Sequence, residues 1–349
     1  MTVDSHRIAV IAGDGIGPEV IDAAIPILDA AATKHRFRLS WERLPYSADH
    51  YLKTKETLPE GAFQHVRDDV DAIFLGALGD PRVPGNEHAR DILLGLRFRL
   101  DLYVNFRPVT LLHPDLSVLK NSRAIDFVIF RENTEGQYLG RGRTSGDEYI
   151  AEEVNTGTGV ARIIRAAFEW ARAHSKTRVT MSDKSNAIPT HRVWQETFKA
   201  IAGEYRDIEA EHRYVDALAL ELVRSPERFQ VIVTNNLYGD ILSDLGAGLV
   251  GGLGLAPSAN LHPGRRGGRG GLFEPVHGSA PALVGKGIAN PMAAVLTGAL
   301  MFEQLGHSSA AREVESAVRA TLQAGVRTQD LGGKATTAEV AAKLMTLLG

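Results

Sequence analysis

The feature that most constrains this chain is an alternation of short apolar runs with longer segments of helical periodicity. Five β-branched runs without a polar face lie at residues 8–11, 72–75, 127–130, 178–181 and 231–234. Strands buried on both faces have this pattern, which is typical of parallel sheets covered by helices. Helical periodicity occurs at residues 19–33, 159–174, 190–202 and 292–305. The alternation therefore predicts an α/β fold.

Two unusual segments predict where the chain crosses between domains. The length of 349 residues suggests about two domains. Residues 101–110 alternate apolar and polar side chains, as a strand leaving one layer for another would, and the glycine-rich residues 246–271 predict a bend and an irregular loop. We predict a discontinuous domain of residues 1–100 plus 252–349, and a second domain of residues 101–251. The cleft between them is the default ligand site.

Composition excludes several classes of function. The absence of cysteine removes disulfide frameworks and thiol chemistry, so a metal ion would need oxygen or histidine ligands. With 39 Lys+Arg against 42 Asp+Glu, no global basic surface favours nucleic acid, and the local exception is Arg265, Arg266 and Arg269. We find no signal peptide and no apolar run long enough to cross a membrane. We expect a soluble, cytoplasmic protein without nucleic-acid or membrane partners.

A glycine-rich turn at residues 13–19 follows the first predicted strand. Its G-x-G-x-G spacing differs from the G-x-G-x-x-G dinucleotide fingerprint, and no strand with an acidic end follows about 20 residues later. A tight turn with Pro18 in the first helical turn explains the same residues. The sequence therefore does not predict a Rossmann fold.

Two carboxylates, Asp240 and Asp244, lie four residues apart in an apolar context. On a helix they would share one face and repel each other by roughly a few tenths of a kcal/mol unless a cation or a base lay between them. Carboxylate oxygens suit Mg²⁺ or Mn²⁺. The alternative is that Asp240 is a helix N-cap following Gly239 and that Asp244 is solvated.

Three arginines lie near the ends of predicted elements. Arg97 ends a predicted helix, Arg107 lies on the next strand, and Arg131 ends a buried run. A single arginine is more often solvated, but Arg107 and Arg131 each end a run typical of a buried strand, where a charge is unfavourable unless it is paired. Converging guanidinium groups would suit bidentate recognition of a small polycarboxylate. The alternative is internal salt bridges to Glu132 or Asp101.

Three further residues are candidates for proton transfer or ligand binding. Lys184 follows a predicted strand and Tyr138 lies in a loop, and either could act as a general acid or base in a cleft, although each alone is more often a loop residue. His277 precedes a helix expected to begin near Pro281, whose N–H groups could hold a phosphate or a ribose. A lone histidine is more often structural.

In chain order, these segments resemble the β-decarboxylating dehydrogenases, the family of 3-isopropylmalate, isocitrate, homoisocitrate and tartrate/malate dehydrogenases. The matching segments are residues 13–19, 96–108, 131–138, 183–186, 214–216, 235–245 and 273–291. The resemblance implies an isopropylmalate dehydrogenase-like two-domain fold, not a Rossmann fold, with a central mixed sheet and an interdomain active-site cleft. It also implies oxidation of a (2R)-hydroxy acid by a nicotinamide coenzyme, followed by decarboxylation, with Mg²⁺ or Mn²⁺.

The resemblance assigns substrate and metal roles residue by residue. The arginines that would hold the malate carboxylates are Arg97, Arg107 and Arg131. The metal ligands would be Asp240 and Asp244, together with the partner subunit's Asp216.

The implied proton-transfer residues are Lys184, which comes from the partner subunit and assists deprotonation of the hydroxyl group, and Tyr138, which protonates the enolate. Because active sites are shared between subunits, a homodimer is implied. The implied coenzyme-binding positions are Asn186, Glu274, His277, Gly278, Ser279, Ala280, Ala282 and Asn290.

Two departures from the family pattern bear on specificity. Members that use NAD usually carry an aspartate where this chain has Ala282, but no residue suited to a 2′-phosphate replaces it, so we favour NAD over NADP without excluding NADP. Isocitrate enzymes carry Ser and Asn where this chain has Asp91 and Leu93. Leu93 suits an apolar substituent and argues against isocitrate.

The substrate expectation is therefore a 3-substituted (2R)-malate, with 3-isopropylmalate as the best single candidate. Residues 132–136 and 330–337 are more similar to the isocitrate, homoisocitrate and tartrate branches. Tartrate or D-malate is the main alternative. Homoisocitrate dehydrogenase activity and a non-catalytic dicarboxylate sensor are further alternatives.

Overall fold

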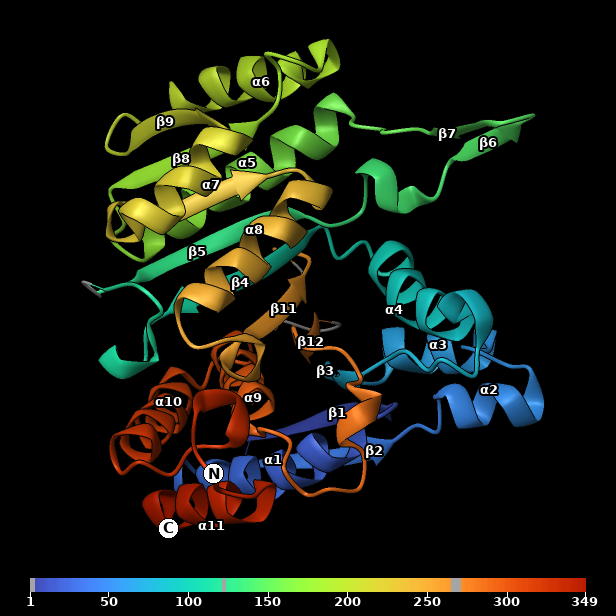
Figure 1. The fold of residues 1–349 in the computed structure, drawn as a ribbon, viewed down its shortest axis with the longest axis vertical. Coiled ribbons are helices and arrows are strands. Elements are labelled where there is room, and N and C mark those ends of the chain that lie inside the picture. The colour runs from blue at the N-terminus through green and yellow to red at the C-terminus, as the bar shows by residue number, and fades with distance from the viewer. Residues whose placement is uncertain (1–3, 121–123, 265–270) are drawn as a thin grey trace. The chain divides into compact units, whose positions relative to one another are not determined.

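The structure is a computed structural model that describes residues 4–120, 124–264 and 271–349 (Figure 1). The chain divides into two compact units: unit 1 comprises residues 1–102, 112–116 and 251–349, and unit 2 comprises residues 103–111 and 117–250. The predicted crossings lie at residues 100/101 and 251/252, and the return of residues 112–116 to unit 1 was not predicted. Arg265, Arg266 and Arg269, the basic residues considered for nucleic acid, lie outside the described residues.

Ten strands form the predicted mixed sheet, five of them in each unit. The unit 1 strands, in spatial order, are β2 (Phe37–Arg43), β1 (Asp4–Gly13), β3 (Ala72–Ala77), β12 (Gly271–Pro275) and β11 (Pro257–Leu261). In unit 1, only the β11–β12 pair described here is antiparallel. The unit 2 order is β4 (Val104–Thr110), β5 (Asp126–Glu132), β10 (Val231–Thr234), β8 (Arg178–Asp183) and β9 (Glu209–Tyr214). There β4 runs antiparallel to β5, and the other described pairs are parallel.

Helices cover both faces of the unit 1 strands, because successive strand side chains point to opposite faces. One face carries α1 (Gly17–Lys34) and α9 (Met292–Gln304), with α10 (Ser308–Gln323) and α11 (Thr337–Leu348) packed on them. The other face carries a buried cluster that joins Ile73 and Leu75 of β3 to α3 (Glu60–Asp68) and α4 (Glu87–Arg99). The remaining helix of the N-terminal segment is α2 (Ala48–Thr54).

The unit 2 strands are covered in the same way. On one face lie α5 (Gly157–Ala173) and α6 (Arg192–Ala202). On the other, α7 (Val215–Arg224) and α8 (Asn236–Leu249) pack on β4, β5 and β10 through a buried apolar cluster. A two-stranded ribbon, β6 (Gly142–Ser145) and β7 (Glu148–Ala151), projects away from the rest of unit 2 in Figure 1.

The five apolar runs are all strands, and the four periodic segments correspond to α1, α5, α6 and α9. Two expectations are wrong. The segment expected to be an irregular loop contains β11. The helix expected near Pro281 is a 3₁₀ turn, Pro281–Leu283, because Val284 has a non-helical ψ of 130° and the next glycines, Gly285 and Gly287, have positive φ. Among the described residues, no helix is long and apolar enough to cross a membrane.

Candidate functional site

Unit 2 brings five of the predicted site residues into one cluster, which we call the acid–guanidinium cluster: Arg107, Arg131, Tyr138, Asp240 and Asp244. The strand register explains part of this arrangement. Arg131 on β5 lies directly opposite Asn105 on β4, and Arg107 follows Asn105 by two residues. Side chains two residues apart share a face, so both guanidinium groups point to the side on which α8 packs.

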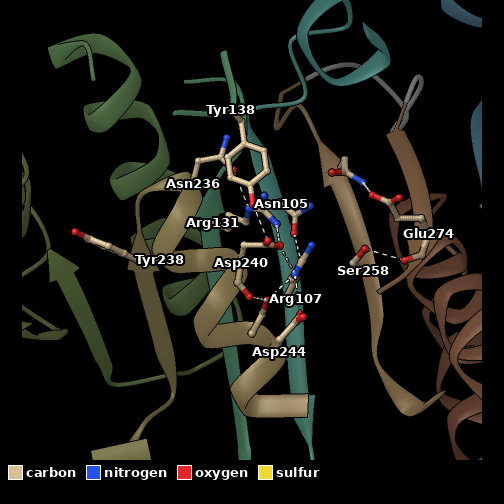
Figure 2. Close-up of polar contacts among 12 residues, drawn as sticks. Asn105, Arg107, Arg131, Tyr138, Asn236, Tyr238, Asp240, Asp244, Ser258 and Glu274 are labelled. Atoms are coloured by element: carbon tan, nitrogen blue, oxygen red, sulfur yellow. Dashed lines mark hydrogen bonds and ion pairs between the residues drawn. The ribbon is translucent and has the colours of Figure 1, made fainter. Parts of the chain in front are cut away.

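Asp240 is the centre of this cluster (Figure 2). Its Oδ1 accepts from Arg131 Nη1 and from Arg107 Nη1, the latter at 3.2 Å. Its Oδ2 accepts from Tyr138 Oη at 2.7 Å. The Arg131 side chain is 1% exposed and that of Arg107 is 8% exposed, so both guanidinium groups need a counter-charge.

The N-cap alternative for Asp240 is wrong. Helix α8 begins at Asn236, and the Asn235 side chain caps it by accepting from the Tyr238 N–H at 2.9 Å. Asp240 and Asp244 therefore lie inside the helix, one turn apart on the same side. Arg107 Nη1 is 3.2 Å from Asp240 and 3.6 Å from Asp244, so one guanidinium group pairs with both.

Neutral side chains fix the two arginines. Arg107 Nε donates to Asn105 Oδ1 at 2.7 Å, and its Nη1 donates to Ser243 Oγ at 2.6 Å. Arg131 Nε donates to Asn236 Oδ1 at 2.9 Å. Of these partners, none was a candidate from the sequence, because single Asn and Ser residues carry no motif.

Gly239 allows Arg131 to lie against the helix backbone. A Cβ atom at residue 239 would come within 2.5 Å of Arg131 Cγ, closer than any van der Waals contact. The Arg131 Cζ atom also lies 5.0 Å from the centroid of the Tyr138 ring, within range of a cation–π interaction. The glycine and the tyrosine thus define the position of this arginine from two sides.

Burial raises the pKa of Tyr138, and its hydrogen bond to Asp240 adds to the effect. The phenol is therefore protonated at neutral pH and available as a proton donor. Burial also raises the pKa of Asp244; Arg107 opposes this shift and the charge of Asp240 reinforces it. Two carboxylates one turn apart, of which Asp240 disfavours the ionisation of Asp244, are an oxygen donor set that a bound divalent cation would stabilise.

Lys184 and Asp216 form a separate pair in unit 2. Lys184 Nζ lies 2.5 Å from Asp216 Oδ1, and this hydrogen bond lowers the pKa of Asp216. In the described part of the chain, the set of three acidic or histidine side chains near enough to bind one metal ion lies elsewhere, in unit 1. Within one chain, therefore, Asp216 does not complete a three-carboxylate site with Asp240 and Asp244.

The buried His191 and the partly buried Glu153 form a pair that contacts both the Lys184 loop and helix α8, and that was missed from the sequence. The backbone N–H of Lys184 donates to His191 Nδ1 at 3.2 Å, so the ring proton of His191 lies on Nε2. This Nε2 is 3.1 Å from both Glu153 carboxylate oxygens. The interaction with His191 lowers the pKa of Glu153. Glu153 also accepts from Asn235, the cap of α8, at 3.0 Å. This carboxylate thus connects the Lys184 loop to the helix that carries Asp240.

In unit 1, Arg97 pairs with another predicted site residue, Glu274. Arg97 Nη2 donates to Glu274 Oε1 at 2.6 Å, and Asn260 Nδ2 donates to the same oxygen at 2.9 Å. Both charges are nearly buried, and Arg97 Nε has no hydrogen-bond partner. Glu274 lies on β12 opposite Ser258 of β11, whose hydroxyl donates to the Glu274 carbonyl at 2.7 Å (Figure 2).

Unit 1 also holds a cavity of about 370 Å³ whose lining includes Ile16, His277, Ala280, Asn290 and Asp330. His277 Nδ1 lies 3.1 Å from the Gly278 carbonyl oxygen. Because a carbonyl only accepts, the proton is on Nδ1 and Nε2 is an acceptor. This buried nitrogen has no partner, and burial lowers the pKa of His277, so the ring is neutral. A ligand that reached this nitrogen from the cavity that His277 lines would find an acceptor without a partner.

Asp330 was not among the coenzyme-binding positions predicted from the sequence. It lines this cavity, and its Oδ2 accepts from Asn290 Nδ2 at 3.0 Å. A carboxylate therefore lines this cavity, whereas the position at which the family pattern predicts an aspartate is Ala282 in this chain. Asp330 does lie in the segment 330–337, whose similarity to the isocitrate, homoisocitrate and tartrate branches of the family was noted from the sequence.

The remaining predicted positions differ in exposure. Gly278 and Ala282 are exposed, whereas Ser279 is buried and its carbonyl accepts from the Ile16 N–H at 2.8 Å. Gly15, where φ is +59°, lies so close to the same carbonyl that a Cβ atom there would be 1.9 Å from its oxygen, so only glycine fits. Asn186 lies in an exposed turn of unit 2, and Leu93 packs against the apolar cluster of unit 1.

Comparison with known proteins identifies the family. The family model described as isocitrate/isopropylmalate dehydrogenase matches residues 7–345. The chain belongs to this family. It is 42% identical to a 3-isopropylmalate dehydrogenase of Corynebacterium jeikeium, over 98% of this chain and 99% of the other. It is 39% identical to a Bacillus subtilis protein named "Probable tartrate dehydrogenase/decarboxylase", over 100% of this chain and 99% of the other.

A solved structure extends the similarity to three dimensions. Isocitrate dehydrogenase from Methylococcus capsulatus has a TM-score of 0.89 and 38% identity, covering 98% of this chain and 99% of the other. Members of the isocitrate/isopropylmalate dehydrogenase family are enzymes, decarboxylating dehydrogenases, and the mixed-sheet fold predicted from the sequence is the family's fold.

Proposed function

We propose that this protein oxidises and decarboxylates a 3-substituted (2R)-malate with NAD and a divalent cation, and that 3-isopropylmalate is its preferred substrate. The observation that carries the proposal is the acid–guanidinium cluster, where two buried arginines and a protonated tyrosine meet at one aspartate. Such a set can bind two carboxylates and donate one proton.

In this proposal, Arg107 and Arg131 give up hydrogen bonds to Asp240 and form ion pairs with the substrate carboxylates instead. Arg107 and Arg131 each keep a neutral partner, Asn105 and Asn236, and so stay oriented during the exchange. Arg97, whose Nε has no hydrogen-bond partner, is the third arginine that the family resemblance assigns to substrate binding.

The oxygen donor set of Asp240 and Asp244 fits Mg²⁺ or Mn²⁺. When bound, the cation would polarise the C2 oxygen, and NAD would accept the hydride from C2. Lys184 takes the hydroxyl proton as the C2 carbonyl forms. The bond to the β-carboxylate then breaks, CO₂ leaves, and its electron pair stays on the substrate as an enolate. Tyr138 Oη returns a proton to C3 of that enolate.

The cavity in unit 1 supports NAD as the coenzyme. The unpaired Nε2 of His277 is an acceptor suited to the exocyclic amine of adenine. The Asp330 carboxylate would accept from a ribose hydroxyl group and repel a 2′-phosphate, which favours NAD over NADP.

We also propose that the enzyme works as a homodimer in which Lys184 and Asp216 complete the site of the partner subunit. Their pairing with each other, apart from Asp240 within one chain, supports this arrangement. Co-expressing Lys184→Ala with Tyr138→Phe tests it. Random pairing would restore roughly a quarter of wild-type activity through mixed dimers that hold one intact site. Activity no greater than that of the two variants mixed as separate dimers would contradict the shared site.

A panel of hydroxy acids tests the substrate. Initial rates with 3-isopropylmalate, D-malate, tartrate, homoisocitrate and isocitrate, each with NAD and with NADP, would give kcat/KM for every pair. We expect the highest value for 3-isopropylmalate with NAD, in line with the apolar Leu93. A higher value for D-malate or tartrate would favour the second candidate, which the Bacillus subtilis relative and residues 132–136 support. Binding of these acids without NADH formation would instead indicate a sensor.

A further inference from the structure

A second polar centre lies in unit 1, and it has no place in the proposed reaction. It consists of Asp4 and His6 on β1 and His307 immediately before α10. The two imidazole Nε2 atoms are 2.7 Å apart. Asp4 Oδ2 lies 3.7 Å from His6 Nε2 and 3.6 Å from His307 Nε2. We call these residues the His–His–Asp triangle.

Hydrogen bonding alone does not explain the triangle. One shared proton can join the two imidazoles, but the carboxylate oxygen is too far from either ring for a hydrogen bond. It faces both nitrogens and bonds to neither. Ligand atoms arranged tetrahedrally around one zinc ion at about 2.1 Å are about 3.4 Å from each other. The distance between the two nitrogens, 2.7 Å, is shorter than this value, and the two distances to the carboxylate oxygen, 3.6 and 3.7 Å, are slightly longer.

The fold holds the three side chains in place. Asp4 and His6 are two residues apart on a strand, so they share a face. His307 follows a helix end at which Gly306, with φ of +90°, donates to the Glu303 carbonyl and the His307 N–H donates to Phe302. These two bonds form a Schellman motif, which fixes the backbone of His307.

The His307 ring is fixed as well. It stacks on Phe37 with the centroids 3.7 Å apart and the planes inclined by only 3°. Phe37 is buried on β2 and packs edge-on against Phe302. Because both backbone and ring are held, little entropy would be lost when His307 binds a ligand.

The charges around the triangle also permit a cation. Two basic side chains outside it, Lys34 and His35, each lie 2.6 Å from an oxygen of Glu313, whose single negative charge offsets part of their positive charge. Asp4 is exposed and supplies a negative charge. The site is therefore open to solvent on the carboxylate side and closed on the side of the two rings, whose side chains are 12% and 16% exposed.

We propose that the His–His–Asp triangle is a binding site for a divalent transition-metal ion, Zn²⁺ in the first place, that joins β1 to the α9–α10 turn. Two imidazole nitrogens and one carboxylate, with water in a fourth position, match the ligands of Zn²⁺ and of Ni²⁺ or Co²⁺, whereas Mg²⁺ prefers oxygen ligands alone. The site is independent of the acid–guanidinium cluster, which is made of oxygen and guanidinium groups in unit 2.

Equilibrium dialysis against Zn²⁺, with millimolar Mg²⁺ present to occupy carboxylate sites, is the direct test. Wild-type protein freed of metal is compared with Asp4→Asn, His307→Gln and the control His35→Gln, which changes the neighbouring imidazole outside the triangle. We expect wild type and His35→Gln to bind one Zn²⁺ per chain at this site, and His307→Gln to bind it more than about 100-fold more weakly. Asp240→Asn should retain this Zn²⁺, which separates the site from the proposed reaction.

Two readouts besides stoichiometry complete the test. Zn²⁺ at 100 times its Kd should raise Tm by about 5 °C in wild type and His35→Gln but not in the triangle variants. In ¹H–¹⁵N spectra of histidine side chains, the Nε2 resonances of His6 and His307 should shift together. Asp4→Asn alters an exposed side chain, so its weaker binding could not be ascribed to misfolding. Equal Zn²⁺ affinity in wild type and His307→Gln, equal occupancy by Mg²⁺, or unmoved Nε2 resonances would overturn the proposal.

Discussion

The acid–guanidinium cluster of unit 2 and the cavity of unit 1 differ in how their buried polar groups are partnered. In the cluster, buried charges meet built-in counter-charges: Arg107 and Arg131 share Asp240. In the cavity, His277 is neutral and leaves an acceptor without a partner. The first arrangement is suited to a charged ligand that takes over existing ion pairs, and the second to an uncharged ring that supplies a missing hydrogen bond. The two proposed sites therefore differ in the charge of the ligand group that each is suited to bind.

The largest effect is expected when the centre of the cluster loses its charge. Asp240→Asn should lower kcat/KM by about 10³-fold, because both arginines lose a counter-charge and the proposed cation loses a ligand. The matched control is Asp207→Asn, which removes a carboxylate paired with Arg172 on the surface of unit 2. Steady-state rates would check this, with circular dichroism to establish folding. Full activity in folded Asp240→Asn would remove the cluster from the proposed site.

The next largest effect concerns the proton donor. Tyr138→Phe should reduce kcat by about 10²- to 10³-fold with a small change in KM, because the phenol is lost while the arginines remain. Tyr238→Phe is the control, since Tyr238 lies apart from the cluster (Figure 2). Trapping of the decarboxylated but unprotonated product would sharpen the result. Equal losses in the two variants would mean that Tyr138 has only a packing role.

A smaller effect is expected in the cavity. Asp330→Asn should reduce the preference for NAD over NADP by about tenfold, equivalent to roughly 1.4 kcal/mol, because the carboxylate no longer repels a 2′-phosphate. The ratio of kcat/KM for the two coenzymes is the measurement, and Glu227→Gln in unit 2 serves as a charge-matched control. An unchanged ratio would show that Asp330 does not face the ribose.

The smallest effect is on stability. The pKa of Asp244 is raised in the folded protein, so ionising this group opposes folding. In metal-free protein, Asp244→Asn should raise Tm slightly at pH 7. The gain should vanish as pH falls below the ordinary value of 3.8, where the carboxyl is protonated in both states. Thermal melts from pH 3 to pH 8 in a chelating buffer would show this. A constant difference across that range would mean that the charge of Asp244 is fully compensated.

Five core strands (β1, β3, β5, β8 and β10) and four helices (α1, α5, α6 and α9) were predicted because their periodicity is local. Strands β2 and β9 were not predicted, since their burial patterns mix exposed and half-buried residues, and an edge strand of this kind has no apolar face to reveal it. Strand β11 was hidden in a glycine-rich segment, where the prediction of an irregular loop was wrong.

Within the candidate site, residue types were easier to predict than pairings. Asp240 and Asp244 were recognisable as a pair because their i,i+4 spacing is local. The pairing of Arg97 with Glu274 joins residues 177 positions apart, and that of Lys184 with Asp216 joins residues 32 apart. Glu153 and His191 escaped notice because their importance lies in contacts with Lys184 and Asn235, and a sequence shows no such contact.

Gly239 has a consequence for attempts to change the substrate. Helix interiors disfavour glycine by roughly 1 kcal/mol relative to alanine, yet no larger residue fits here without displacing Arg131. In a mutagenesis library, we therefore expect position 239 to tolerate no other residue, because a side chain there would displace Arg131 and remove the carboxylate recognition proposed for it before it altered selectivity. Diversity aimed at the malate substituent belongs instead at Leu93, which is only half-buried and whose neighbours in the apolar cluster can repack.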